Sequence, residues 1–151
     1  MQISAKADYA IRAALSLASH APRLVKAEEL VREQRLPRKF IEAILGDLRR
    51  AGIVRAQRGA EGGYGLARPA GEITLGQILR AVDGPLAEVR GVRPHDWTGE
   101  GVAAHLPTVW IAMRAALRQV LDETTLEHVL TGRLPARVRR MAETPGAWLP
   151  R

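Results

Sequence analysis

The sequence predicts a mainly α-helical protein with one small β-hairpin. Three observations lead to this fold class. Apolar residues recur at helical spacing in three stretches before residue 52, two short apolar runs then flank a glycine-rich turn, and helical spacing returns after residue 101. The chain has 151 residues, which suits one domain with an appendage and allows a core that needs no disulfide or structural metal.

The first helix is expected from Ser4 to Ser19, with Ser4 as its N-cap and residues 20–22 (His-Ala-Pro) ending it. Asp8 and Arg12 stand four positions apart and should pair on its exposed side. The residues that share its core face are Ile3, Ala7, Ile11, Ala14, Leu15 and Ala18.

Two more helices are expected over residues 27–34 and 37–51. Pro37 suits the first turn of the longer one, and Gly52 is placed for a left-handed cap after it. The side chains expected to face the core are Ala27, Leu30 and Val31 from the short helix, and Phe40, Ile41, Ile44, Leu45 and Leu48 from the long one.

A β-hairpin is expected next, with strands over residues 53–57 and 64–68 and a glycine-rich turn over residues 58–63. Thr74 then caps a helix over residues 75–82, which the Asp-Gly-Pro sequence at 83–85 ends. Its inward side chains should be Leu75, Ile78, Leu79 and Val82.

A long helix is expected over residues 102–123, because apolar residues there step by four and three positions in a heptad-like seam. Such a helix is about 30 Å long and needs a partner to pack against. A short helix should follow at 125–130, and another turn at 135–142. The seam residues expected to form a dimer contact are Leu106, Trp110, Met113, Leu117 and Val120.

The predicted organisation is therefore a first domain over residues 1–84, a regulatory loop over 85–101, a dimerisation helix with a short following helix over 102–131, and a C-terminal tail over 132–151. Residues 1–70 hold 13 basic and 7 acidic side chains, a net charge of +6. Residues 71–151 hold 10 and 9, a net charge of +1. The excess in one half favours a polyanion-binding domain joined to a neutral one.

The order helix, helix, tight turn, helix, hairpin is typical of a winged helix-turn-helix, which binds double-stranded DNA. The helix at 37–51 would enter the major groove, and Arg38 and Lys39 lie at the end that reaches base edges. Glu42 could accept a hydrogen bond from cytosine.

The hairpin would be the wing, with Arg58 reaching a minor groove or its edge and Arg55 assisting at the backbone. Glycines beside Arg58 allow a close approach to phosphate. A nucleotide phosphate loop is excluded because no Gly-Lys-Ser/Thr follows.

The chain resembles the Rrf2 family of bacterial winged-helix regulators. The motifs that carry the resemblance are Ile3-Ser4-Ala5-Lys6-Ala7-Asp8-Tyr9-Ala10, Phe40-Ile41-Glu42-Ala43-Ile44-Leu45, Ala51-Gly52-Ile53-Val54, Arg58-Gly59, Gly62-Gly63-Tyr64, Leu66-Ala67-Arg68-Pro69 and Glu72-Ile73-Thr74-Leu75. The resemblance implies a homodimer with paired long helices on a pseudo-palindromic operator, and it places Ser4, Lys6 and Tyr9 near the DNA backbone.

From the pattern and the resemblance together, the predicted DNA-contacting residues are Ser4, Lys6, Tyr9, Pro37, Arg38, Lys39, Glu42, Arg55, Arg58, Gly59, Gly62, Gly63 and Tyr64. We expect a sequence-specific regulator, most simply a repressor, in the cytoplasm and without a membrane span. The alternative is a module controlled mainly by a partner protein or small-molecule effector at the loop and dimer helix.

One departure from the family matters. Members that bind an iron–sulfur cluster carry three cysteines in the loop before the long helix, and this chain has no cysteine. We therefore expect no cofactor and no metal site. His95, Asp96 and His105 are candidate ligands whose spacing matches no metal motif, while Trp97 and Trp110 could line a pocket or form core and dimer contacts. No catalytic constellation is found, so the chain is not expected to be an enzyme.

Overall fold

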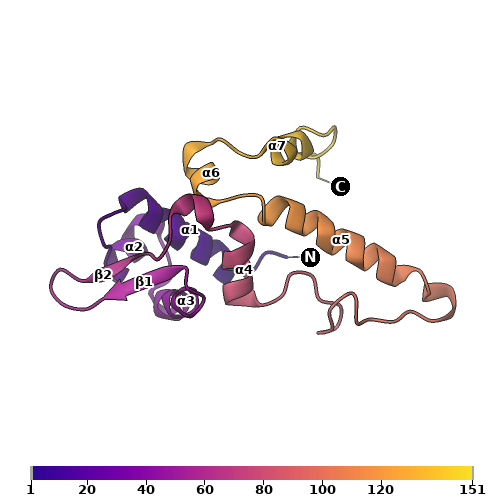
Figure 1. Cartoon of the computed structure of the whole chain (residues 1–151), viewed down its shortest axis with the longest axis horizontal. Helices are drawn as coiled ribbons and strands as arrows, with labels where there is room; N and C mark the ends of the chain where they lie inside the picture. The colour runs from indigo at the N-terminus through magenta and orange to yellow at the C-terminus, as the bar shows by residue number, and fades with distance from the viewer. Residues whose placement is uncertain (1, 151) are drawn as a thin grey trace.

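The computed structural model, which describes residues 2–150, confirms a mainly α-helical fold with one hairpin (Figure 1). A compact N-terminal lobe carries the hairpin, and a long helix projects from it. The elements are α1 (Ala5–His20), α2 (Ala27–Gln34), α3 (Arg38–Arg50), β1 (Val54–Gln57), β2 (Gly63–Leu66), a 3-10 turn (Ala70–Glu72), α4 (Leu75–Asp83), a second 3-10 turn (Gly101–Ala103), α5 (Leu106–Leu121), α6 (Leu126–Thr131) and α7 (Ala136–Ala142).

Helix α1 is the centre of the lobe, and its small side chains let other helices approach closely. The Oγ atom of Ser4 accepts a hydrogen bond from the Ala7 amide at 2.9 Å, so the expected N-cap is confirmed. The expected pair of Asp8 and Arg12 is present at 3.3 Å. The fully buried apolar residues of α1 are Ala7, Ala10, Ala13, Ala14 and Leu17. Helices α3, α4 and α6 pack against this surface.

Helices α2 and α3 lie where the sequence predicts them, but three expected core residues are not buried: Ala27 and Val31 are half-buried, and Phe40 is exposed. Ile41, Ile44, Leu45 and Leu48 are buried as expected, whereas Phe40 remains 38% exposed. Phe40 lies at the edge of the apolar stripe, where its ring lies 6.1 Å from the ring of Tyr9. The buried face of α3 is therefore narrower than the sequence pattern predicts.

The wing, which we define as residues 54–66, is an antiparallel hairpin with Val54 opposite Leu66 and Gln57 opposite Gly63. A third segment joins it. The Val25 amide donates to the Tyr64 carbonyl, and the Tyr64 amide donates to the Val25 carbonyl, both at 2.8 Å. The base of the wing is thereby fixed to the connection between α1 and α2.

Helix α4 starts at Thr74 with a capping box: the Thr74 hydroxyl accepts from the Gln77 amide, and the Gln77 side chain accepts from the Thr74 amide. The chain returns to this point after α5. The Leu75 amide donates to the Thr124 carbonyl at 2.9 Å, the Leu126 amide donates to the Ile73 carbonyl at 3.0 Å, and Leu126 is fully buried. Helix α6 is thus part of the N-terminal lobe's core.

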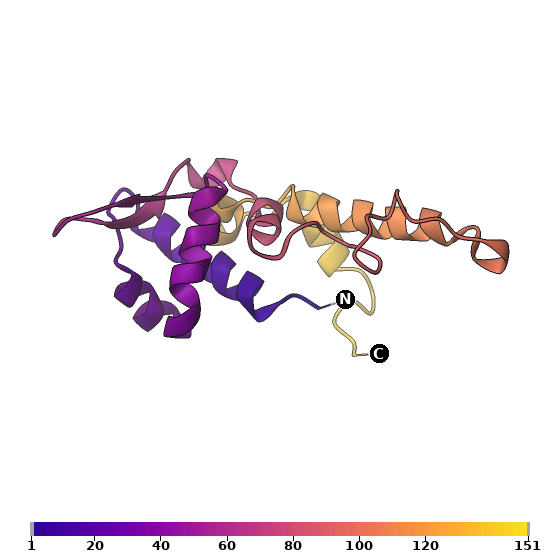
Figure 2. The same ribbon diagram turned by 90° about the horizontal axis from the view of Figure 1, so that it is seen from below.

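Helix α5 is shorter than expected, because it begins at Leu106 and not at residue 102. Pro107 has no amide hydrogen for the Ala103 carbonyl, and its ring disfavours helix before it, so a separate 3-10 turn fills residues 101–103. The 16 residues of α5 span about 24 Å. The wing and the N-terminal end of α5 lie at opposite ends of the molecule (Figure 2).

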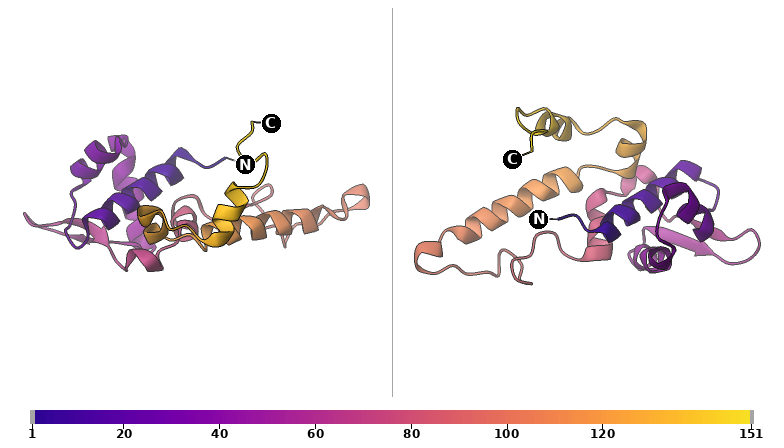
Figure 3. Two further views of the ribbon diagram at one scale, coloured as in Figure 1. Left: turned by 90° about the horizontal axis from the view of Figure 1, so that it is seen from above. Right: turned by 180° about the vertical axis from the view of Figure 1, so that it is seen from behind.

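None of the 16 residues of α5 is buried by the chain itself. Helix α5 joins the lobe only at its C-terminal end, while α7 lies on the other side of it from the loop at 85–101 (Figures 1 and 3). Within residues 2–150, no helix has both the length and the apolar character that crossing a membrane requires.

Candidate nucleic-acid interface

The N-terminal end of α3 presents cationic side chains to solvent. The Arg38 side chain is 79% exposed, and its nearest carboxylate, Glu28, lies 3.8 Å away, which makes a weak surface pair. The Lys39 ammonium lies 5.0 Å from the centre of the Phe40 ring. Pro37 is the N-cap of α3 and is half-buried, while Glu42 is exposed one turn further along. This end of the helix is free to meet a duplex.

The wing tip carries an exposed arginine on a turn that requires glycine. Arg58 is exposed, and among the described residues its side chain has no hydrogen-bond or ion-pair partner. Gly59 has a φ of +104°, a conformation that side chains disfavour. The Gly62 amide donates to the Gly59 carbonyl at 3.0 Å, and a Cβ on Gly62 would lie 2.2 Å from the Gln57 carbonyl oxygen. Close backbone packing therefore fixes the shape of the turn that carries Arg58.

Three wing residues expected at the DNA have structural contacts in the fold. Gly63 lies so close to Val25 that a Cβ would be 2.8 Å from the Val25 carbonyl oxygen. Tyr64 provides the backbone bonds to Val25 and is half-buried. The Arg55 side chain lies along the hairpin and donates from Nε to the Leu66 carbonyl at 3.2 Å. Their contacts to DNA stay a prediction.

The residues at the start of α1 connect the helices of the lobe. The Ser4 hydroxyl donates to Asp83 at 2.6 Å, at the end of α4. The Lys6 ammonium lies 2.6 Å from the Asp47 carboxylate on α3 and donates to the Val82 carbonyl at 3.0 Å. The Lys6 hydrogen bond, together with the charges of Lys6 and Arg50, holds the pKa of Asp47 below its ordinary value against the opposing effect of burial. Lys6 therefore couples α3 to α4.

Lys26 is a cation that sequence reasoning missed. It lies at the N-cap of α2, is exposed, and lines an open groove of about 540 Å³ between α2, Glu42 and the wing. The signal was present, since a lysine follows directly on the strand-like Leu-Val before α2. Only the fold shows that this position faces the wing, so Lys26 is a further candidate contact to DNA between α3 and the wing.

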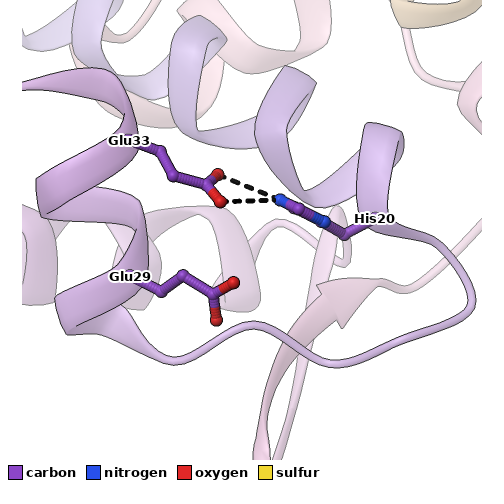
Figure 4. Close-up of side chains that lie close together, drawn as sticks. All are labelled: His20, Glu29 and Glu33. Carbon is purple, nitrogen blue, oxygen red and sulfur yellow. Dashed lines mark hydrogen bonds and ion pairs between the residues drawn. The ribbon is translucent and has the colours of Figure 1, made fainter.

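A cluster of His20, Glu29 and Glu33 at the junction of α1 and α2 has three ligand atoms within 4.8 Å of one another (Figure 4). Arg23 neutralises much of its charge: it donates to both carboxylate oxygens of Glu29, at 2.7 and 3.1 Å, and lies 2.9 Å from His20 Nδ1. His20 Nε2 lies 3.0 Å from both oxygens of Glu33.

Hydrogen bonds from Arg23 to Glu29 and from His20 and Ser16 to Glu33 lower the pKa values of the two carboxyl groups. The two ring nitrogens of His20 thus have Arg23 and Glu33 as partners. The cluster therefore ties α1 to α2 through hydrogen bonds and ion pairs within the protein.

Comparison with known proteins gives the family. The Rrf2 family, described as iron-dependent transcriptional regulators, matches residues 3–132. An HTH-type transcriptional regulator of Mycobacterium tuberculosis is 46% identical over 144 residues, which is 95% of this chain and 89% of the relative. The chain belongs to the Rrf2 family. The resemblance predicted from its motifs is thereby confirmed.

Solved structures agree with this assignment. The structure of CymR, the global cysteine regulator of Bacillus subtilis, has a TM-score of 0.73 at 31% identity and covers 87% of this chain and 98% of its own. The T. potens IscR structure has a TM-score of 0.71 at 30% identity and covers 88% of each chain. The winged helix-turn-helix fold expected from the sequence is confirmed. This Rrf2-family chain is a DNA-binding transcriptional regulator and not an enzyme.

The iron of the family description does not fit this chain as a thiolate-held cluster, because no cysteine is present. The loop at 85–101 also offers no assembled alternative. His95 Nε2 lies 3.5 Å from Asp96, but its other nitrogen lies 3.1 Å from the Arg114 guanidinium, whose charge would repel a metal cation. His105 is exposed at the start of α5, away from this pair. Within residues 2–150, these three side chains form no ligand group.

Proposed function

We propose that this Rrf2-family protein binds a pseudo-palindromic operator as a homodimer, with α3 in the major groove and the wing at the adjacent minor groove. One observation carries this proposal: Arg58 at the wing tip and Arg38 and Lys39 on α3 are exposed cations on two elements of one lobe. Operator occupancy would exclude polymerase from an overlapping promoter, so we propose repression, in the cytoplasm where the chromosome lies.

The homodimer is supported by the exposure of α5. Leu106, which belongs to the seam, and Val109, which lies beside it, are 38% and 54% exposed, although burial of such side chains contributes about 1.5–3 kcal/mol each. The seam residues Met113 and Leu117 are only partly covered. A second copy packed along this helix would bury the seam and present two lobes to successive half-sites about one DNA turn, roughly 34 Å, apart.

The dimer is tested by placing a charge in the seam. Leu117→Glu should give a monomer in light scattering and lose operator binding, because an unpaired carboxylate would be buried at the helix contact. Ala115→Glu is the matched control: residue 115 is exposed and lies about 160° around α5 from residue 117. A Leu117→Glu protein that stays dimeric and binds normally would contradict the proposed interface.

The operator is tested by selection of bound sequences from random duplex DNA. We expect two inverted half-sites related by a two-fold axis. A single, asymmetric site bound by one protomer would contradict the pseudo-palindrome, and no enrichment at low ionic strength would contradict sequence-specific binding.

A further inference from the structure

A cavity of about 450 Å³ lies where α4, the loop at 85–101 and α5 meet. Figure 1 places the loop at 85–101 and α5 on the far side of α4 from the wing. The volume lies in the range of pockets that hold small organic ligands. Its lining residues are Arg80, Gly84, Pro85, Leu86, Arg93, His95, Arg114 and Arg118. Neither Trp97 nor Trp110 lines this cavity.

The lining carries four guanidinium groups and no carboxylate. Arg80 is paired with Asp122 at 2.7 Å, just outside the cavity. Arg114 contacts only the ring of His95, at 3.1 Å, and no ion pair to Arg93 or Arg118 is found within residues 2–150. Within the described residues, three guanidinium groups thus border one open cavity without an ion-pair partner, with Arg93 and Arg118 exposed and Arg114 half-buried.

Such a lining matches an organic anion better than any other ligand class. Like charges in one cavity repel one another, and a bound anion would remove that repulsion. Guanidinium groups also bind carboxylate and phosphate through two parallel hydrogen bonds. Pro85 and Leu86 add an apolar wall for the carbon skeleton of a ligand.

We propose that this cavity binds a small organic polyanion with at least two phosphate or carboxylate groups, held by Arg93, Arg114 and Arg118. Arg80 is the fourth contact, for which the ligand competes with Asp122. Because the Arg80–Asp122 pair joins α4 to α5, a ligand that takes Arg80 changes how the dimer helix is attached to the DNA-binding lobe.

A short series of side-chain contacts connects this cavity to α3. Arg80 lies two residues before Val82 on α4. The Val82 carbonyl accepts a hydrogen bond from the Lys6 ammonium, and Lys6 is paired with Asp47 on α3. A ligand bound in the cavity would therefore also alter the affinity of the protein for its operator. This second statement rests on the proposed DNA-binding function, whereas the binding statement does not.

Binding is tested by calorimetry with pyrophosphate and with citrate, which separate a phosphate site from a carboxylate site, and with glucose as the uncharged control. We expect one of the two anions to bind once per protomer, and glucose not to bind. Arg114→Ala and Arg118→Ala should each weaken that binding about tenfold, since each removes a charge-assisted pair. Arg139→Ala, which removes an exposed arginine of α7, should leave it unchanged.

Asp122→Asn gives the opposite expectation. It keeps the shape of the side chain but releases Arg80, so anion affinity should rise about threefold. The binding proposal is overturned if neither anion binds below about 1 mM, if Arg114→Ala and Arg118→Ala bind as the parent does, or if Arg139→Ala weakens binding equally. Weaker binding by Arg139→Ala would mean that the anion is attracted by the overall positive charge of the protein and not by the cavity.

The effect on DNA is measured with the selected operator, with and without the anion that binds. A change in operator affinity of about fivefold or more, absent in Arg118→Ala, supports the coupling. An unchanged operator affinity with the cavity saturated would overturn it. Operator binding without any anion is the test of the proposed function, so the two failures are distinguishable.

Discussion

Arg58→Ala should reduce both operator affinity and its dependence on salt. In the proposed complex, four exposed cations of each protomer would face the duplex, namely Lys26, Arg38, Lys39 and Arg58. A dimer would then neutralise about eight phosphates, which corresponds to a slope of log K against log salt of about −7. Raising salt fourfold, from about 50 to about 200 mM, should lower the affinity of the parent protein by about 10⁴.

Removing Arg58 from both protomers takes away two of these contacts, so the slope should become about −5. The assay is fluorescence anisotropy of a labelled operator duplex at four or five salt concentrations. Arg139→Ala is the control, because it removes the same charge from α7 and should leave the slope near −7.

The reasoning is refuted if the Arg58→Ala protein keeps the parent slope and affinity. That result would mean that the wing tip does not touch the duplex, and the exposed position of Arg58 would then have no role in binding. An equal change in Arg139→Ala would show instead that overall net charge, and not the wing, sets the salt dependence.

Two further predictions concern the lobe itself. Gly62→Ala should weaken operator binding at least tenfold while the helical circular dichroism is kept, because its Cβ would lie 2.2 Å from the Gln57 carbonyl oxygen and the wing turn must open. The control Ala60→Gly, at an exposed position of the same turn, should bind the operator as the parent protein does. Parent-like operator binding by Gly62→Ala would contradict the turn geometry. Asp47→Asn should remove part of the acid sensitivity of folding. The folded-state pKa of Asp47 is depressed, so its stabilisation is present above its ordinary value of 3.8 and is lost as pH falls through the lower folded value. Urea unfolding from pH 6 to pH 2.5 measures this, and an identical pH profile in both proteins would contradict it.

The local elements were predictable because their signals are local. The short helix at 27–34 has the bounds that its pattern predicts, and the N-caps at Ser4 and Thr74 are confirmed. Gly52 has the expected positive φ, at 69°. A helix cap, a left-handed glycine or a hairpin turn depends on a few neighbouring residues, so the local sequence is sufficient to predict it.

Longer elements were predicted less well where a distant neighbour decides the outcome. Phe40 fits the apolar stripe of α3, but Tyr9, 31 positions away, meets it at the lobe's surface. Helical spacing also extended the long helix back to residue 102, whereas Pro107 starts it later. Periodicity identifies a face, but it does not say how much of that face another element will cover.

The candidate site was likewise only partly readable from the sequence. The order of helices, the glycines of the wing and the excess of positive charge before residue 71 are properties of the chain, and they were sufficient to predict a DNA-binding regulator. They did not show that Lys6 would pair with Asp47, or that Gly63 and Tyr64 would anchor the wing at Val25.

Periodicity and turn chemistry thus determined the fold class, and the lack of cysteine excluded a thiolate-held cluster, whereas the family followed from the resemblance of the motifs. Tertiary structure alone decided that α6 returns to the first lobe, that α5 stays uncovered, and that Arg80, Arg93, Arg114 and Arg118 surround one cavity. The physical reason is sequence distance. These arginines span 38 positions in three segments, and no local pattern records which side chains will meet after the helices pack.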